Sequence, residues 1–391
     1  MDAVRASHGE SVLMARHVLI LGAGASQPFS APLMSDFLDV ARSLYAAGQV
    51  NDAKDSYARV FRAISRLQLV HSKAELDFNN LEAVFTAFEM ADVIKRFPNE
   101  RPEAIETLID DLKVVIVRTL EERITFGYRH HRVRTSETHE RPECRISAAS
   151  EHLSFFNEAG LMGSVMGKNG TLAILTFNYD LLFDMAIMDA GLKVDYGLTE
   201  AAEVKVPSVP LLKLHGSLNW AWNIKPGAEA IAPVYLPLYF KEHPAVREPS
   251  SKPEPIQISR NLPASAALQH GVGLFHKVPF IVPPSWNKMG AYRAIAQVWS
   301  RAAAELTEAH SIYILGFSLP HTDTFFRHLY ALGTVGDTLL KRFWVFNPDP
   351  SREEAFRSLL GPGARGRFEF DRMLDRRNPP LVRIAQAIRA D

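Results

Sequence analysis

The sequence has very little cysteine: Cys144 is the only one in 391 residues. A single thiol excludes disulfide bonds within the chain and also excludes the thiolate cages that hold structural zinc. Proteins without disulfides are typical of reducing compartments. We therefore expect a cytoplasmic protein with no bound metal.

The sequence also lacks long apolar runs and an excess of charge of either sign. No apolar stretch approaches the ~20 residues that a membrane-spanning helix needs, and the N-terminus does not have the basic-then-apolar order of a signal peptide. Basic and acidic residues number 44 each, which gives no overall attraction to nucleic acids or membranes. The mild arginine excess in residues 363–391 is more typical of a solvated face than of a nucleic-acid contact.

What the sequence does have is a series of short apolar runs that alternate with helical patterns. Such runs, bounded by glycine or polar residues, are typical of buried parallel strands. Their alternation with helices predicts an α/β fold: a Rossmann-like, mostly parallel sheet with helices on both faces. The predicted strands lie at His17–Leu21, Leu172–Thr176, Leu211–Leu214, Phe280–Val282, Ser311–Leu315 and Phe343–Phe346.

Helical periodicity fills the long stretch between the first two strands. Apolar residues recur at helical spacing over about residues 52–125, and a first helix is predicted to begin near Ser35, whose hydroxyl can cap it. We predict a single domain over residues 1–391, with a helical insertion at 36–165 and a C-terminal segment at 363–391. Further helices are predicted at His152–Gly160, around Asp184–Ala186, at Ala291–Glu308 and at Leu381–Ile388.

Three stretches without apolar periodicity are predicted to lie outside the core. His130–Arg145 contains three histidines and the cysteine, but their spacing fits no zinc pattern, so a surface loop is predicted. The proline-rich residues 241–262 are predicted to form a loop or hairpin excursion. Pro283–Lys288 reads as a rigid turn with an aromatic ring and a lysine, either a lid or scaffolding.

The first strand runs directly into a turn of small residues, Gly22-Ala23-Gly24-Ala25-Ser26. Small residues let a backbone approach a diphosphate, whose charge is met by exposed amides. The third glycine of the full dinucleotide-binding pattern is missing, and taken alone such a turn is more often a tight strand-to-helix connection than a nucleotide site.

Polar side chains follow two more of the predicted strands. Asn178 and Asp180 come after Leu172–Thr176, and His215 ends the next strand. Ligands of open α/β sheets bind beyond the carboxyl ends of strands, so we expect these three side chains to face one crevice. An amide there can hold a ribose hydroxyl or a water, and a histidine can accept a proton near neutral pH. The alternatives are a helix cap for Asn178 or Asp180 and a structural role for His215.

Two later strands end in the same way. Gly316, Phe317 and Ser318 follow Ser311–Leu315 and are candidates for phosphate or ribose contacts. Asn347 follows Phe343–Phe346 and is a candidate contact of the adenosine ribose. Together these motifs predict chemistry on a nucleotide.

Taken together, the motifs resemble the sirtuin family in kind and in order. The similar segments are the first glycine turn at Gly22–Ser26, the Thr-Gln-Asn-Ile-Asp motif at Thr176–Asp180, the catalytic His-Gly pair at His215-Gly216, the Gly-Thr-Ser phosphate turn at Gly316–Ser318 and the later asparagine at Asn347. The chain departs from sirtuin deacylases, since one cysteine cannot build their four-cysteine zinc ribbon and their Pro-Asp-Phe-Arg loop is not present as such. It is more similar to the bacterial sirtuin-like proteins of anti-phage defence, which share Phe-Asn-Tyr-Asp, Leu-His-Gly-Ser and Gly-(Phe/Tyr)-Ser-Leu-Pro.

This resemblance implies an NAD hydrolase that releases nicotinamide and ADP-ribose and depletes NAD during abortive infection. It implies that Asn178 orients the nicotinamide ribose and the attacking water, that His215 is the general base, and that Asp180 holds the nicotinamide carboxamide. The glycine turn and Ser318 would hold the diphosphate. By analogy, an off state is expected, maintained by homo-oligomer contacts or by a separate sensor such as a HerA-type ATPase/helicase or an Argonaute-type protein.

Two other functions use the same residues. One is a zinc-free protein deacylase or ADP-ribosyltransferase, which would need an acyl-lysine peptide or another acceptor. The other is a regulatory subunit that binds NAD or ADP-ribose without turnover, a role that does not require both Asn178 and His215.

Overall fold

A computed structural model describes residues 17–70, 77–98, 102–136, 139–161, 172–198, 208–223, 230–233, 279–282, 294–320, 324–373 and 377–391. The predicted loop at 241–262 and the predicted turn at Pro283–Lys288 lie outside the described residues. None of the described helices combines the length and the apolar composition needed to cross a bilayer.

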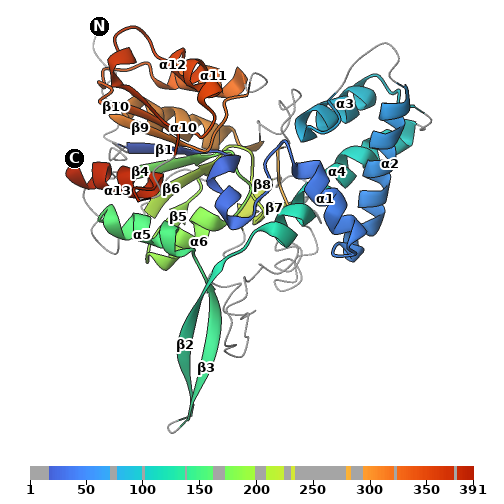
Figure 1. The fold of residues 1–391 in the computed structure, drawn as a ribbon, viewed down its shortest axis with the longest axis horizontal. Helices are drawn as coiled ribbons and strands as arrows, with labels where there is room; N and C mark the ends of the chain where they lie inside the picture. The colour runs from blue at the N-terminus through green and yellow to red at the C-terminus, as the bar shows by residue number, and fades with distance from the viewer. Residues whose placement is uncertain are drawn as a thin grey trace, which may run out of the picture.

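The centre of the fold is a seven-stranded sheet in which every pair of neighbouring strands is parallel. The strand order is β11-β10-β9-β1-β4-β6-β5, so the first strand of the chain lies in the middle (Figure 1). The strands are β1 (His17–Leu21), β4 (Leu172–Thr176), β5 (Lys193–Asp195), β6 (Ser208–Lys213), β9 (Ser311–Leu315), β10 (Arg342–Phe346) and β11 (Phe368–Asp371). The predicted Rossmann-like parallel sheet is confirmed.

Alternate residues of each central strand point to opposite sides, so the sheet has two apolar faces. Helices cover both of them. In β1, Leu19 and Leu21 belong to one apolar cluster, whereas Val18 and Ile20 belong to the other. The first cluster lies under α5 (Ser150–Glu158), α6 (Leu182–Asp189) and α13 (Pro380–Ala390), and the second lies under α10 (Ala296–Glu308), α11 (Thr324–Gly333) and α12 (Glu353–Arg357) (Figure 1).

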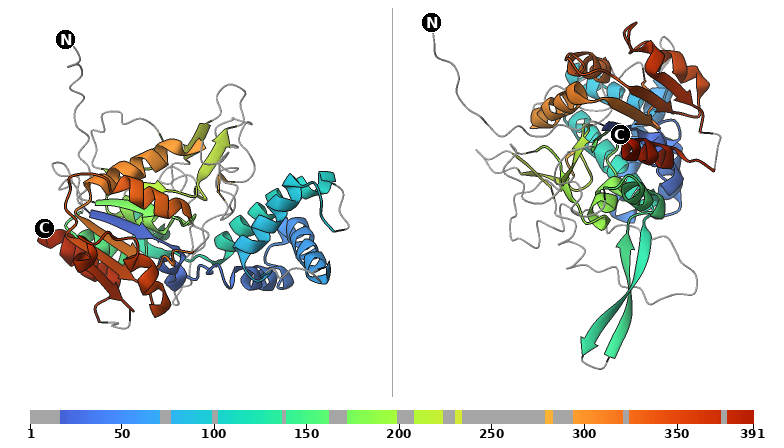
Figure 2. Two further views of the ribbon diagram at one scale, coloured as in Figure 1. Left: turned by 90° about the horizontal axis from the view of Figure 1, so that it is seen from above. Right: turned by 90° about the vertical axis from the view of Figure 1, so that its left-hand side faces the viewer.

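Between β1 and β4 the chain builds a separate group of helices beside the sheet (Figures 1 and 2). They are α1 (Phe37–Ala46), α2 (Lys54–Val70), α3 (Leu81–Val93) and α4 (Pro102–Arg123). The predicted apolar stripes of this region are buried between them: Leu81, Val84, Phe85 and Phe88 on α3, and Leu108, Leu112, Val115, Ile116 and Leu120 on α4. Short 3-10 turns occur at Ala23–Ala25, Gln27–Phe29, Asn51–Ala53, Pro350–Arg352 and Arg365–Arg367.

The stretch predicted as a surface loop, His130–Arg145, instead forms most of an antiparallel hairpin. Its strands are β2 (Gly127–Ser136) and β3 (His139–Ser147), and the ribbon projects away from the rest of the molecule (Figure 2). A ribbon that projects from the core does not need the alternating apolar residues by which strands are recognised, so no periodicity marked it. A second hairpin pairs β7 (Trp220–Asn223) with β8 (Ala230–Pro233).

Two further predictions need correction. Helix α1 begins at Phe37, and its N-cap position is held by Asp36 without a side-chain cap bond, so Ser35 does not cap it. Phe280–Val282 is not a strand of the main sheet. It contributes a single antiparallel bridge between Ile281 and Gly216, the turn that follows β6.

Candidate functional site at the carboxyl end of the sheet

The strand order places a topological switch point beside the first strand. From β1 the chain moves to β4 and β6 on one side, and later to β9 and β10 on the other. In open parallel sheets, ligands bind at the carboxyl ends of the strands at such a point. All the site residues predicted from the sequence lie in segments that follow β1, β4, β6, β9 or β10.

The two glycine turns at the switch point pack directly against each other. The amide of Gly22 donates to the carbonyl of Leu315 at 3.0 Å, and that of Gly24 donates to the carbonyl of Gly316 at 2.8 Å. A Cβ on Gly316, which has a φ of +64°, would lie 2.2 Å from the amide nitrogen of Ala25. These glycines are therefore required by the contact between two protein backbones, whether or not a ligand is bound.

The sequence suggested that the first glycine turn leads into an α-helix, but it does not. It forms a single 3-10 turn over Ala23–Ala25, and the next α-helix begins only at Phe37. The amides of Ala25 and Ser26 are used within the turn. Among the described residues, no hydrogen bond engages the amides of Ala23, Phe317 or Ser318. These three groups, rather than a helix N-terminus, are the donors that remain for an anion.

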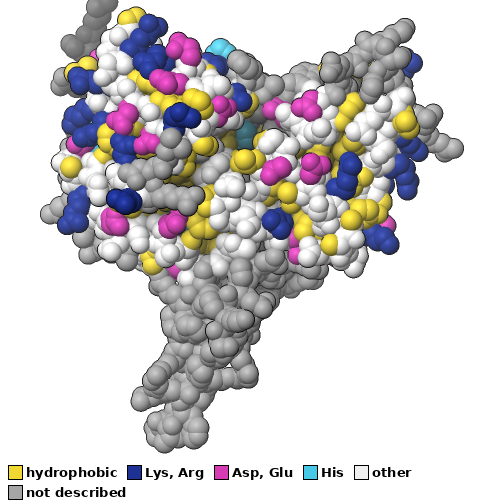
Figure 3. Space-filling model, viewed as in Figure 1, with side chains coloured by type: hydrophobic (Ala, Val, Ile, Leu, Met, Phe, Trp, Pro, Cys, Tyr) yellow, Lys and Arg dark blue, Asp and Glu magenta, His cyan; other side chains and the backbone are white. Residues whose placement is uncertain are grey.

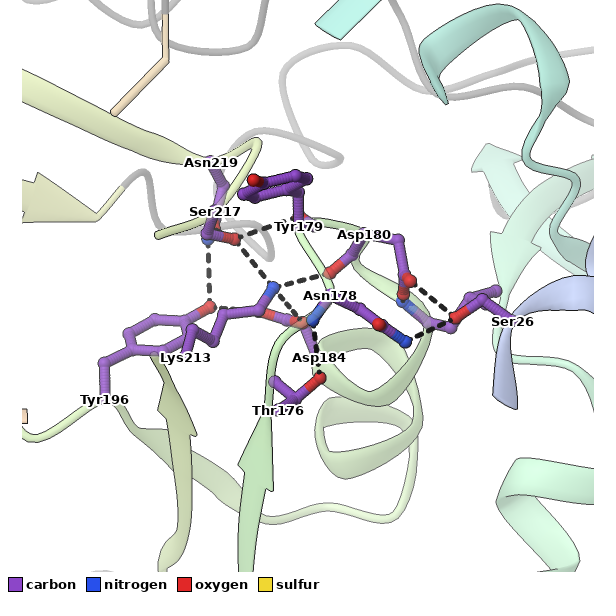
Figure 4. Close-up of polar contacts among 11 residues, drawn as sticks. Ser26, Thr176, Asn178, Tyr179, Asp180, Asp184, Tyr196, Lys213, Ser217 and Asn219 are labelled. Carbon is purple, nitrogen blue, oxygen red and sulfur yellow. Dashed lines mark hydrogen bonds and ion pairs between the residues drawn. The ribbon is translucent and has the colours of Figure 1, made fainter. Parts of the chain in front are cut away.

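Ser26, Asn178 and Asp180 form a hydrogen-bonded cluster between the ends of β1 and β4 (Figure 4). The Asn178 amide nitrogen donates to the carbonyl of Gly22 at 2.8 Å and to the Ser26 hydroxyl at 3.0 Å. Ser26 in turn donates to an Asp180 carboxylate oxygen at 2.6 Å. Because the Gly22 carbonyl can only accept, the orientation of the Asn178 amide is fixed. Its oxygen makes no hydrogen bond within the described part of the chain.

Neither Asn178 nor Asp180 occupies the N-cap position of α6, which is held by Leu181, but Asp180 does bond to the first turn of that helix. The second carboxylate oxygen of Asp180 accepts from the amide of Leu182 at the start of α6, at 3.0 Å. Burial raises the pKa of Asp180 above its usual value, opposed by the nearby charge of Lys213 and by the Ser26 hydrogen bond. Each carboxylate oxygen retains a lone pair for a further donor.

His215 lies two residues beyond Lys213, the last residue of β6, and is almost fully buried. Its ring packs edge-on against Phe177, with ring centres 5.1 Å apart. Gly216 has a φ of +85°, and a Cβ there would lie 2.3 Å from the carbonyl of Phe280. The glycine thus allows the 280–282 segment to hold the turn, through bonds from Val282 to the His215 carbonyl at 2.7 Å and from Ser217 to Phe280 at 3.0 Å.

A group of buried polar residues behind the turn was missed by sequence reasoning. Lys213 is 1% exposed and makes an ion pair with Asp184 at 2.9 Å. Tyr196, Ser217 and Asn219 complete the group (Figure 4). A signal was present, since a lysine within the apolar run Leu211-Leu-Lys-Leu214 needs a buried partner.

Two predicted contacts have structural partners of their own. The ring of Phe317 is buried against Phe177, with centres 4.5 Å apart, so only its backbone remains available to a ligand. The Asn347 side chain donates to the Phe317 carbonyl at 2.9 Å and accepts from the amide of Asp349 at 2.9 Å. Asn347 therefore braces the turn after β9, while Ser318 is exposed.

Within the described ranges, no group of three histidine, cysteine, aspartate or glutamate side chains is placed to hold a metal ion. On the face drawn in Figure 3, basic and acidic side chains are interspersed, and the surface is hollowed between the sheet and the helical group.

No protein-family model and no curated protein matches the chain. Solved structures that match over most of its length are Sir2 homologues. A Sir2 homologue–NAD complex is 12% identical and has a TM-score of 0.36, with 96% of this chain and 89% of that chain covered. A Sir2 homologue mutant in complex with ADP-ribose is 12% identical and has a TM-score of 0.36, with 96% of this chain and 91% of that chain covered. A Sir2–p53 peptide–NAD+ structure is 14% identical and has a TM-score of 0.31, with 97% of this chain and 92% of that chain covered. The fold assignment rests on the strand order and not on these low scores.

Proposed function

We propose that the protein hydrolyses NAD+ to nicotinamide and ADP-ribose at the carboxyl end of its sheet. The observation that carries the proposal is the cluster of Ser26, Asn178 and Asp180, with His215 at the end of the neighbouring strand. The cluster fixes a carboxamide, whose oxygen has no partner among the described residues, beside a buried carboxylate, and a histidine follows the adjacent strand. This combination suits a sugar and a water better than it suits a purely structural role.

The diphosphate of NAD+ would bind at the switch point. The amides of Ala23, Phe317 and Ser318 supply donors from two strands that pack together, and the exposed Ser318 hydroxyl adds another. Successive backbone amides at such turns form an anion-binding concavity without any lysine or arginine.

The chemistry requires few charged groups. The nicotinamide ring carries a positive charge in NAD+ and becomes neutral when its bond to the ribose breaks, so the enzyme does not have to protonate the leaving group. It must place a water at the anomeric carbon and stabilise positive charge on the ribose as the bond breaks. The open oxygen of Asn178 would orient the ribose and the water, His215 would accept the proton, and Asp180 would hold the nicotinamide carboxamide.

We further propose that residues 1–391 act as one catalytic domain, with 36–165 as its helical insertion and 363–391 as its C-terminal segment. Unregulated NAD+ hydrolysis would damage the host, so an inactive state is needed. Homo-oligomer contacts or a separate sensor protein would supply it, and depletion of NAD+ in anti-phage defence is the role in which such an enzyme is useful.

The direct test is release of nicotinamide and ADP-ribose from NAD+ by the purified protein, measured by liquid chromatography, with His215→Ala and Asn178→Ala in parallel. We expect His215→Ala to lose about 1000-fold in kcat and Asn178→Ala about 100-fold. His328→Ala on α11 is the matched control, because this histidine is exposed and lies outside the site.

Full activity of either folded site variant would refute the assignment. Nicotinamide release only in the presence of an acyl-lysine peptide would replace hydrolysis by deacylation. Calorimetric binding of NAD+ without turnover, in the presence of the candidate sensor proteins as well as alone, would replace it by a binding function.

A further inference from the structure

Behind the candidate site, four buried side chains and the partly buried Tyr196 form a closed ring of hydrogen bonds (Figure 4). Lys213 donates to Asp184 at 2.9 Å and to Ser217 at 2.7 Å, and Ser217 donates to Asn219 at 2.7 Å. Asn219 donates to the Tyr196 hydroxyl at 2.9 Å, which donates to the other Asp184 oxygen at 2.6 Å. The ring joins β6, α6, the segment after β5 and the turn after β6.

Lys213 uses all of its hydrogen-bond donors. A lysine has three donors, and the third donor of Lys213 meets the backbone carbonyl of Asp180 at 2.5 Å. One ammonium group thus ties together α6, the turn that carries His215 and the loop that carries Asn178 and Asp180. The positive charge of Lys213 is balanced by Asp184, so the ring is neutral as a whole.

The location of these bonds is more informative than their number. Lys213 and Ser217 lie two residues before and two residues after His215, so the backbone is held on both sides of the imidazole. Asp180 is held through its carbonyl by Lys213 and through its carboxylate by Ser26. A buried ion pair is weak evidence for stability, because apolar residues of similar size often serve a core as well.

We propose that Lys213 is a positioning residue, which with Asp184 and Tyr196 fixes His215 relative to Asn178 and Asp180. This inference rests on the proposed function, since it deepens the account of the same site. Lys213 has no contact with the substrate in this role and acts only through the two segments that it joins.

The test compares Lys213→Met with the double variant Lys213→Met/Asp184→Leu. The single variant leaves a buried carboxylate without its cation and is expected to melt at a lower temperature. The double variant replaces both charges by apolar groups and is expected to recover most of the melting temperature. If the role is positioning, kcat stays about 100-fold below wild type in both variants, with KM changed less than about threefold.

Arg118→Met is the matched control. Arg118 is also buried and ion-paired, with Glu121 and Glu122, but it belongs to α4 in the helical group. We expect it to lower the melting temperature while leaving kcat per folded molecule unchanged. Recovery of both stability and kcat in the double variant would overturn the proposal, because the pair would then be merely structural.

A second measurement remains decisive if the protein does not act on NAD+ at all. Tyr196→Phe opens the ring without leaving a charge unpaired. Hydrogen exchange is expected to quicken at least tenfold in residues 178–182 and 214–219, and to remain unchanged in β1 and β9. Unchanged exchange in those two segments, or a uniform increase over the whole sheet, would overturn positioning. Absence of both NAD+ binding and turnover in wild type would instead count against the proposed function alone.

Discussion

The polar groups at the strand ends are paired differently at the two ends of the central sheet. At the amino end, side chains pair with one another: Arg342 binds Asp391 at 2.6 and 3.1 Å, and His17 lies 3.3 Å from the Tyr313 hydroxyl. At the carboxyl end, two backbones touch through glycine, and the Ala23 amide and the Asn178 side-chain oxygen have no hydrogen-bond partner in the part of the chain that the structure describes.

The difference separates a closed end from an end that can receive a ligand. Both ends have buried histidines, His17 and His215, so a histidine alone does not mark a site. What distinguishes the carboxyl end is the combination of close backbone contacts made through glycine, backbone amides without a partner among the described residues, and a side-chain amide of fixed orientation.

The largest stability effect should come from breaking the backbone contact at the carboxyl end. Gly316→Ala puts a Cβ 2.2 Å from a backbone nitrogen in a left-handed conformation. We expect it to lower the free energy of unfolding by about 3–5 kcal/mol. Gly363→Ala is the control, since a Cβ there meets nothing within 4 Å. Urea denaturation measures both, and a loss below about 1 kcal/mol for Gly316→Ala would contradict the described packing.

At the amino end the expected effect depends on pH. Burial lowers the pKa of His17 from 6.5 to about 4. The unfolded chain therefore takes up a proton at a higher pH than the folded chain does. The stability from neutral His17 is complete above pH 6.5 and is lost as pH falls from 6.5 to 4, by about 3 kcal/mol in total.

His17→Leu should remove that part of the acid sensitivity. Denaturant unfolding at pH 7, 5.5 and 4 should show a smaller loss for the variant than for wild type. His152, whose ring packs at a tilt against Phe29 and Phe183, has its pKa lowered to about 4 by burial and acts in the same direction, so some sensitivity will remain. If the pH dependence of stability is the same in His17→Leu as in wild type, folding does not lower the pKa of His17.

The smallest expected effect on stability comes from removing a single hydrogen bond near the carboxyl end of the sheet. The Tyr179 hydroxyl donates to the carbonyl of Val282 at 2.7 Å, on the far side of the backbone from Asn178. Tyr179→Phe should cost about 1 kcal/mol of stability. At the amino end, Tyr313→Phe removes the longer contact to His17 and should cost less. A larger loss for Tyr313→Phe in thermal unfolding would reverse the order.

The sequence was sufficient for elements whose burial leaves a pattern. Strands β1, β4 and β9 have the bounds that were predicted, because a strand covered on both faces has a largely apolar run at its centre. The β2–β3 hairpin projects from the body and needs no such pattern, so it was taken for a loop. The apolar run Phe280–Val282 is buried, but against the turn after β6 and not within the sheet.

For the candidate site, the sequence predicted which segments would meet but not the bonds between them. Asn178, Asp180 and His215 do follow neighbouring strands, as their positions after apolar runs indicated. The bond of Ser26 to Asp180 and the ring around Lys213 depend on side-chain directions that only the folded chain defines. The roles assigned to these residues stay predictions.

The bond between Ser26 and Asp180 joins residues 154 positions apart, and the glycine turn next to Ser26 is completed only by Gly316. A chain emerging from the ribosome therefore cannot assemble this end of the sheet until β9 has been synthesised, late in translation. Any activity that depends on this end of the sheet would therefore be absent throughout most of synthesis, and partial products that end before β9 would lack it.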